Sequence, residues 1–218
     1  MSLIMSFETY EGIVMTADRM ATVSFYNENF KTTESFCKTK NAHKIFVMKN
    51  GYGISFCGAS SFNNNLLEEY VTNQICLHDF EDLSPESISN QILHMLKEQY
   101  NGARIISIMC GYYNNNSFTI EIDTSKEKIY EYSDSSKNQV VRYGETDIAD
   151  AVLDKKFYYG YSTYRLQDGI ELLKFTNFVS AKYQEFQENL QTISEDCDIL
   201  ILKPNGTHEW LSKQTLHV

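Results

Sequence analysis

The chain has 218 residues, 42% of them apolar, and a formal net charge of −10. This length and apolar content predict one globular domain over residues 1–218 with a substantial core. The acidic balance argues against nucleic acid and against an anionic membrane surface as partners, because both are bound largely through lysine and arginine. No apolar run approaches the ~20 residues of a membrane-spanning helix, and no basic segment precedes an apolar run at the N-terminus. We therefore expect a cytoplasmic protein without a signal peptide.

Residue types that often carry chemistry show no familiar arrangement. The five cysteines are odd in number, scattered and without a Cys-x-x-Cys pair, which favours reduced thiols in an intracellular protein. A catalytic cysteine stays an alternative, since sequence does not reveal the setting that lowers a thiol pKa. The five histidines show no metal-ligand spacing, so neither a metal nor a cofactor is predicted. Ser60, Ser61 and Ser162 lack a Gly-x-Ser-x-Gly context, which argues against a separate serine triad.

The N-terminal stretch from Ser2 to Arg19 predicts a β-hairpin. The apolar side chains of its first arm alternate, and so share one face: Leu3, Met5 and Phe7. The turn falls on residues 9–12, where Gly12 can adopt a positive φ. The second arm ends in Asp18 beside Arg19. If Met1 is removed, Ser2 carries a free α-amine and a hydroxyl together, which is one way to activate a weak nucleophile.

The later elements are predicted from the alternating apolar pattern of strands and the three-to-four-residue apolar pattern of helices. Residues 21–26 suit extended chain, 27–33 a loop, and 35–39 are ambiguous. Residues 44–48 and 52–57 predict a second hairpin, with Asn50-Gly51 in a type I′ turn. Further on, we expect helices over 62–77, from Ser84-Pro85 onward and over 166–188, and strands over 104–111, 118–122, 128–132, 198–202 and up to Trp210. Residues 133–149 are left unassigned.

This order of elements predicts the fold class. Antiparallel hairpins dominate, and the β-α-β alternation of a doubly wound parallel sheet is absent from the predicted order. Two antiparallel sheets that pack together would each leave one face for helices to cover. We therefore expect an α+β protein with a four-layer αββα sandwich, two packed antiparallel sheets flanked by helices.

Several residues near the N-terminus are spaced in a way that resembles the N-terminal-nucleophile hydrolases: Gly12, Asp18-Arg19, Lys44-Ile45 and Gly58. The likeness is greatest to proteasome β subunits and to the peptidase ring of the bacterial two-part ATP-dependent protease. In that family the nucleophile is the first residue of the mature chain, and counting without gaps places it on Ser2. The catalytic lysine falls on Lys44 and the oxyanion-hole glycine on Gly58. The segment between Asp18 and Lys44 is longer than usual for the family, which implies an insertion.

The resemblance implies a role for each matched residue. The Ser2 amine would take the hydroxyl proton while Oγ attacks an amide carbonyl, giving an acyl-enzyme that water hydrolyses. Lys44 would lower the pKa values of the amine and hydroxyl, and Asp18 would orient Lys44. The Gly58 N–H would donate to the developing oxyanion. The implied partners are a peptide or amide substrate and further copies of the chain, and any activating ATPase is left open.

The supporting residues match the family only in part. The nucleophile is serine where the proteasome uses threonine. The family has Gly-Ser-Gly where Tyr161 occupies the matching position, and Ser162 lies one step away. Before the last strands the family has an aspartate and then a serine, and these align with Gln191 and Ser194, so the acid is missing. Arg19, Ser162 and Ser194 form the supporting set.

Three functions are compatible with this sequence. The first is an N-terminal-nucleophile amidohydrolase or peptidase, assembled as a homo-oligomer. The second is a catalytically inactive subunit that keeps the fold as an assembly or interaction scaffold, as proteasome α subunits do. In that case Asp18 and Lys44 form a structural ion pair and Gly58 a bend. The third is a small-molecule amidase that acts outside any ring. The 15 tyrosines and 13 phenylalanines fit either core packing or a subunit interface.

Overall fold

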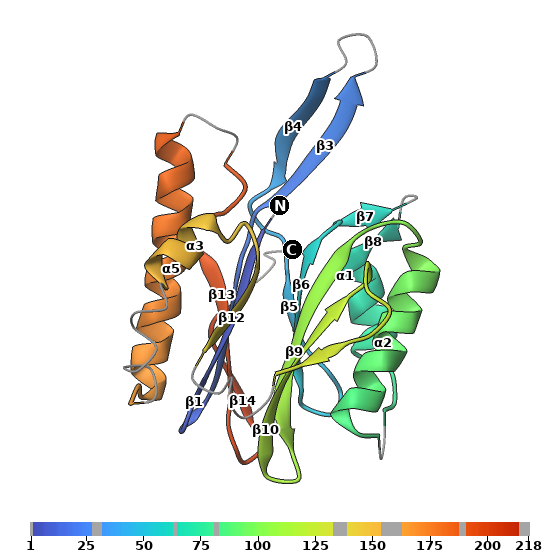
Figure 1. Cartoon of the computed structure of the whole chain (residues 1–218), viewed down its shortest axis with the longest axis vertical. Coiled ribbons are helices and arrows are strands. Elements are labelled where there is room, and N and C mark those ends of the chain that lie inside the picture. Colours follow the sequence, from blue (N-terminus) through green and yellow to red (C-terminus); the bar gives the residue numbers. More distant parts are fainter. Residues whose placement is uncertain are drawn as a thin grey trace.

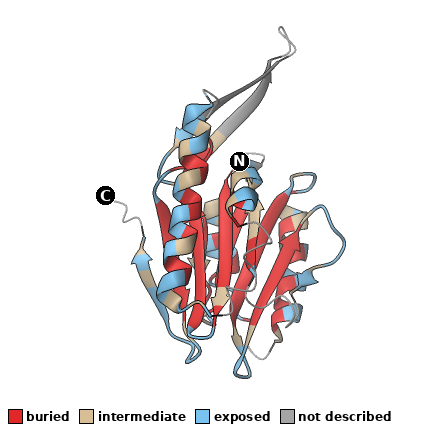
Figure 2. Ribbon diagram, turned by 60° about the vertical axis from the view of Figure 1, so that its left-hand side comes forward, coloured by how far each residue is buried: buried red, intermediate tan, exposed pale blue. Residues whose placement is uncertain are grey.

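Two five-stranded antiparallel sheets pack face to face, and helices cover the outer face of each (Figure 1). This computed structural model describes residues 2–27, 32–62, 65–80, 83–132, 139–153, 163–187 and 191–213. The four-layer α+β sandwich predicted from the order of elements is confirmed. Figure 2 shows the central strands of the two sheets buried along most of their length.

The first sheet holds the N-terminal hairpin at its centre. Its strand order is β12 (Val140–Gly144), β1 (Leu3–Thr9), β2 (Gly12–Asp18), β13 (Cys197–Leu202) and β14 (His208–Ser212). Helices α3 (Asp147–Val152) and α5 (Leu166–Phe186) lie on its outer face (Figure 1). In β1, Leu3, Met5 and Phe7 pack in the cluster that contains the α5 side chains, while Ile4 packs in the cluster toward the second sheet. Both faces of β1 are therefore buried, which explains why its sequence is apolar almost throughout.

The second sheet has the order β11 (Tyr130–Glu131), β10 (Asn116–Asp123), β9 (Ile105–Tyr113), β6 (Gly53–Gly58) and β5 (Ile45–Val47). Helices α1 (Leu67–Tyr70) and α2 (Pro85–Gln99) cover it, with the π-helix η1 (Val71–Ile75) directly after α1. The predicted start of α2 is confirmed, since Ser84 Oγ accepts a hydrogen bond from Ser87 N at 3.2 Å and Pro85 is the first helical residue.

The two Asn-containing hairpin turns differ. Asn114 and Asn115 both have positive φ, +50° and +63°, as a two-residue type I′ turn between β9 and β10 requires. The type I′ turn predicted at Asn50-Gly51 is wrong, because Asn50 is not among the described residues with positive φ. Instead, Gly51 N donates to Met48 O at 2.9 Å and Gly51 alone takes the left-handed conformation, at φ +85°. Glycine is favoured there because it lacks a Cβ.

A long hairpin leaves the sandwich between Asp18 and Lys44. Strands β3 (Ala21–Asn27) and β4 (Thr32–Thr39) pair with each other and project beyond both sheets (Figure 1). This hairpin occupies the segment where the resemblance implies an insertion, and its base lines the same cavity as Ser2 at the start of β1. The extended chain predicted over 21–26 is confirmed, and the predicted loop is shorter than expected because β4 already begins at Thr32.

Other differences from the predicted elements concern weak or short patterns. The helix predicted over 62–77 forms over 67–75, as α1 followed by η1, and the small strands β7 (Ser61–Phe62) and β8 (Asn65–Leu66) precede it. The unassigned residues 133–149 contain β12 and the start of α3. Among the helices of the described ranges, none is both long enough and apolar enough to cross a membrane.

Candidate active site

Ser2 is held in place from two sides at the start of β1. Its residue is 6% exposed, and its carbonyl oxygen accepts a hydrogen bond from Glu145 N at 2.8 Å. The next residue, Leu3, donates its N–H to Asp18 Oδ1 at 2.8 Å. The first contact comes from the chain just after β12 and the second from the end of β2. The neighbours of β1 in the sheet thus fix the position of Ser2.

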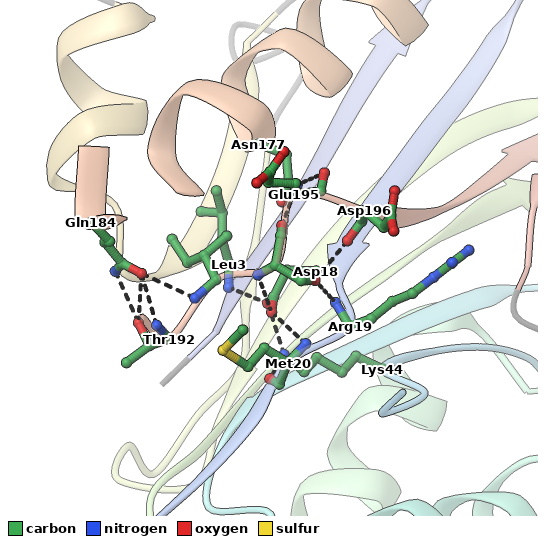
Figure 3. A network of polar contacts seen from close by, with 12 residues as sticks. Leu3, Asp18, Arg19, Met20, Lys44, Asn177, Gln184, Thr192, Glu195 and Asp196 are labelled. Atoms are coloured by element: carbon green, nitrogen blue, oxygen red, sulfur yellow. Dashed lines mark hydrogen bonds and ion pairs between the residues drawn. The ribbon is translucent and has the colours of Figure 1, made fainter. Parts of the chain in front are cut away.

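Asp18 lies at the centre of a buried network (Figure 3). Its carboxylate accepts hydrogen bonds from Leu3 N and Met20 N, each at 2.8 Å, from Lys44 Nζ at 2.7 Å and from Ser194 N at 3.4 Å. Asp18 is 1% exposed. All four partners are donors, an arrangement that suits a carboxylate and not an amide.

Lys44 is buried beside this carboxylate. It is 7% exposed, and its ammonium group donates to Asp18 Oδ1 and to the carbonyl oxygen of Met20. An ammonium group has three N–H donors, so the third is available to a group in the adjoining cavity. That cavity, called the first cavity here, has a volume of about 210 Å³ and is lined by Ser2, Lys44 and Gly58 together. The structure thus brings three of the four predicted catalytic residues to one cavity. The fourth, Asp18, is in contact with Lys44.

Gly58 ends β6 next to this cavity, in a conformation that requires glycine. Its φ is +105°, and a Cβ at this position would lie 2.4 Å from the carbonyl oxygen of Arg104. The same carbonyl oxygen accepts a hydrogen bond from Ala59 N at 3.1 Å. These two contacts with the Arg104 carbonyl fix the backbone at Gly58, the residue to which the resemblance assigns the oxyanion-hole N–H.

The supporting residue Arg19 contacts β13, β14 and the segment before β13. Arg19 N donates to Ser194 Oγ at 2.7 Å, and the guanidinium donates to Asp198 Oδ1 at 2.7 Å and to Ser212 Oγ at 2.8 Å. Ser194 Oγ in turn donates to Asp196 O at 2.7 Å. Arg19 and Ser194 therefore lie next to Asp18 and contact each other.

Ser162 and Tyr161 lie outside the described residues, so their predicted positions carry no structural account. Gln191, which aligns with the family's acid, is half-buried in the segment before β13. A buried carboxylate is nevertheless present nearby, because Asp198 is 1% exposed and holds Arg19. Sequence reasoning missed Asp198 by treating it as one residue of a central strand. Its signal was a single acid inside an otherwise apolar strand, which is costly unless the charge is paired.

Two further side chains at the first cavity were also missed. His43 lines it, with Nδ1 3.9 Å from Asp198 Oδ2. Cys57 lines it too, and burial raises the pKa of its thiol to about 12, although Lys44 nearby acts in the opposite direction. A thiol with so high a pKa is protonated at neutral pH, which argues against Cys57 as the nucleophile.

A second cavity, of about 610 Å³, opens on the other side of Ser2. Ser2, Cys57 and Gly58 line both cavities, so they form the wall between them. The linings differ in character. The first cavity is walled largely by apolar side chains, among them Phe46, Phe56, Leu66 and Leu67. The lining of the second is more polar than that of the first and includes Arg104, Arg142, Tyr132 and Tyr143.

The tyrosines of the second cavity belong to a closed network. Tyr143 donates its hydroxyl hydrogen to the buried carboxylate of Glu121, and the hydroxyl oxygens of Tyr132 and Tyr143 lie 2.6 Å apart. Burial, followed by the hydrogen bond to Glu121, raises the pKa of Tyr143. These two hydroxyl groups are therefore uncharged, and their hydrogen bonds are made within the wall of the second cavity. Within the described ranges, no three histidine, cysteine or acidic side chains gather closely enough to hold a metal ion.

Comparisons with known proteins support the fold. No protein-family model matches the sequence, and no curated protein matches it. Among solved structures, the chain is similar to the Gly-1 mutant of Anbu from Hyphomicrobium sp. strain MC1, with a TM-score of 0.66. The two are 14% identical, and the match covers 97% of this chain and 88% of that chain. Anbu has a proteasome-like fold, and at this level of identity the similarity shows that the two chains share the fold.

Proposed function

We propose that this proteasome-type fold is an N-terminal-nucleophile amidohydrolase or peptidase, in which Ser2 becomes the nucleophile when Met1 is removed. One observation carries the proposal: Ser2 shares a cavity with Gly58 and with a buried lysine whose ammonium group lies 2.7 Å from the carboxylate of Asp18. A buried ion pair is weak evidence of a stabilising role, because desolvation offsets much of its attraction. Its place beside a candidate nucleophile favours a catalytic one.

The proposed reaction has two acyl transfers. In the first, the Ser2 α-amine accepts the hydroxyl proton, Oγ bonds to the amide carbon, and the C–N bond breaks as that proton passes to the leaving amine. In the second, water loses a proton to the same amine, its oxygen bonds to the acyl carbon, and the C–Oγ bond breaks with return of the proton to Oγ. Lys44 contributes positive charge near the amine, and the Gly58 N–H donates to the oxyanion.

The first cavity suits the acyl part of a substrate. It has room for one side chain, and its phenylalanines and leucines would remove an apolar side chain from water. We therefore expect a peptide or amide with an apolar residue on the carbonyl side of the cleaved bond. A small-molecule amide with an apolar acyl group meets the same requirement.

Probe labelling at Ser2 tests the proposal. Intact mass of the purified protein should show loss of one methionine, followed by one covalent adduct with an electrophilic peptide that carries a leucine or phenylalanine. Ser2→Ala should abolish the adduct, since it removes Oγ. Ser60→Ala is the matched control, because Ser60 also lines the first cavity but has no amine of its own to act as base. Equal labelling of wild type and Ser2→Ala would exclude Ser2 as the nucleophile.

A second candidate function, that of a catalytically inactive assembly subunit, is favoured by the outer face of α5. Helices in contact only with a core have one apolar stripe, but α5 has two. Its outward stripe contains large exposed side chains, of which Phe186 is 83% exposed: Phe175, Phe178, Tyr183 and Phe186. Aromatic residues are enriched in protein interfaces. We therefore propose that copies of the chain assemble through this face, whether or not Ser2 is active.

Charged substitutions on α5 test the assembly. The double variant Phe175→Asp/Phe178→Asp should weaken self-association at least about tenfold, because aromatic anchors often contribute ~2 kcal/mol each to an interface. Light scattering over a concentration series measures the change. Leu77→Asp is the control, since Leu77 is 69% exposed on the opposite helix layer. Retained Met1 together with full assembly would support the inactive subunit over the enzyme.

A further inference from the structure

We propose that the second cavity receives the leaving group and that Arg104 binds a carboxylate on it. This inference rests on the proposed function of Ser2. The carboxylate can be the side chain of an acidic residue or the end of a peptide chain, since both present the same two oxygens.

The position of Ser2 assigns the two cavities to the two sides of the cleaved bond. Ser2 and Gly58 lie in the wall between the cavities. An amide carbon at Ser2 Oγ, with its oxygen toward the Gly58 N–H, has its acyl group on one side of this wall and its nitrogen on the other. Because the first cavity is small and apolar, it suits the acyl side chain, which leaves the larger polar cavity for the amine.

Arg104 is held next to this wall by its own backbone. Its carbonyl oxygen is fixed by Ala59 N and lies so close to Gly58 that no Cβ would fit between them. The guanidinium extends along the second cavity with its side chain 64% exposed. Arg104 therefore places a permanent positive charge in the second cavity, on a residue whose backbone packs against Gly58.

Most of the Arg104 side-chain donors have no protein partner among the described residues. A guanidinium has five N–H donors, and in the described part of the chain one nitrogen is engaged, with Nη2 3.0 Å from Asp123 Oδ2. Asp123 is buried, and it also accepts hydrogen bonds from Ser125 N and Oγ, at 2.9 and 2.7 Å. Asp123 thus anchors one edge of the guanidinium, while the other edge can bind a carboxylate through two parallel hydrogen bonds.

Arg142, the other cation of the cavity, is committed elsewhere. Its Nε donates to Asp150 and its Nη1 donates to Val140 O at 3.0 Å. Asp150 Oδ2 also accepts a hydrogen bond from Thr146 Oγ1 at 3.0 Å. Among the described residues, Arg142 thus has two nitrogens engaged where Arg104 has one. Glu145 adds a negative charge to the lining, beside the backbone that holds the Ser2 carbonyl. A leaving group with its new amine near Glu145 and its carboxylate at Arg104 would match both charges.

The test compares leaving groups that differ only in charge. Two internally quenched peptides share an apolar acyl side and differ by glutamate or glutamine directly after the cleaved bond. The ratio of their kcat/KM values should favour glutamate, and Arg104→Gln should lower this ratio about tenfold, as expected for loss of a charged hydrogen bond. Arg104→Lys should recover part of the ratio, because lysine keeps the charge but not the planar pair of donors. Glu145→Gln should raise the ratio.

Lys128→Gln is the matched control, since it removes an equally positive charge at an exposed residue outside both cavity linings. Its ratio should equal that of wild type. If Arg104→Gln and Lys128→Gln give the same ratio, the inference is wrong, although the role of Ser2 stands as long as both peptides are cleaved.

Product binding separates this inference from the proposed reaction. In NMR titrations, Glu-Ala-amide and Ala-Ala, which carry a side-chain and a terminal carboxylate, should bind more tightly than Ala-Ala-amide, and Arg104→Gln should remove the difference. Whichever of the first two binds more tightly identifies the source of the carboxylate. Equal binding of all three peptides would overturn the inference even if Ser2 is labelled. Absence of labelling at Ser2 with carboxylate binding intact would overturn the proposed reaction instead.

Discussion

Replacing Asp18 by asparagine is expected to lower the free energy of unfolding by about 3–5 kcal/mol, the typical result of leaving a buried ion without its partner. The carboxylate of Asp18 accepts from Leu3 N, Met20 N, Ser194 N and Lys44 Nζ. An asparagine NH₂ would face at least one of these donors and leave the Lys44 ammonium group without a negative partner. Urea unfolding at neutral pH measures the loss. We also expect probe labelling at Ser2 to disappear, because Leu3 is the residue directly after it.

Asp79→Asn is the control for this prediction. Asp79 pairs with Lys49 at 2.6 Å, nearly the same distance, but both side chains are more than half exposed, at 52% and 55%. Exposed pairs contribute at most about 1 kcal/mol, so Asp79→Asn should change stability little. Equal effects of the two substitutions would contradict the burial of the Asp18–Lys44 pair.

Gly144→Ala should disable Ser2 without touching any side chain of the site. Gly144 has a φ of +105°, and a Cβ there would lie 1.7 Å from the carbonyl oxygen of Ser2. Backbone at this contact cannot yield as a flexible side chain does, so Ser2 must move. A misplacement of ~1 Å can cost about 100-fold in rate, and we expect a loss of that order in the rate of probe labelling at Ser2.

Gly206→Ala separates this effect from ordinary glycine strain. Gly206 also has a positive φ, +78°, but a Cβ there would meet no atom within 4 Å. Alanine in the left-handed region costs roughly 1–2 kcal/mol, so Gly206→Ala should lower stability modestly and leave the labelling rate unchanged. If Gly144→Ala labels as fast as Gly206→Ala, the contact between β12 and Ser2 does not position the nucleophile.

The fold class could be predicted because the strongest sequence signals were local. The hairpin of β1 and β2 follows from alternation and from the turn before Gly12, and α2 from the Ser84-Pro85 start. β12 could not be predicted in the same way. Its five residues include Arg142 and Tyr143, and they pair with β1 across more than a hundred residues of sequence. Such a strand forms because β1 offers an edge, and no local pattern records that.

Site residues could be predicted where their spacing in the sequence identified them. They could not be predicted where pairing between distant strands brings them to the site. Ser2, Lys44 and Gly58 were placed by their spacing, and the structure brings them to one cavity. Asp198 was overlooked because an acid was expected at Gln191, in the loop before β13. Pairing of β13 with β2 sets Asp198 opposite Ala17, and thereby next to Arg19. The register between two strands decided this contact.

Strands β12 and β13 lie on either side of the β1–β2 hairpin, although they are synthesised much later. This order affects when the site can form during translation. The ribosome completes Ser2, Asp18, Lys44 and Gly58 within the first 58 residues, but strands β12 and β13 and the contacts from Glu145 N to Ser2 and from Ser194 N to Asp18 come from beyond residue 139. Pairings so distant in sequence form late, because the loop between them must first be closed. A nascent chain therefore carries every residue of the proposed catalytic set long before the contacts that position Ser2 can form.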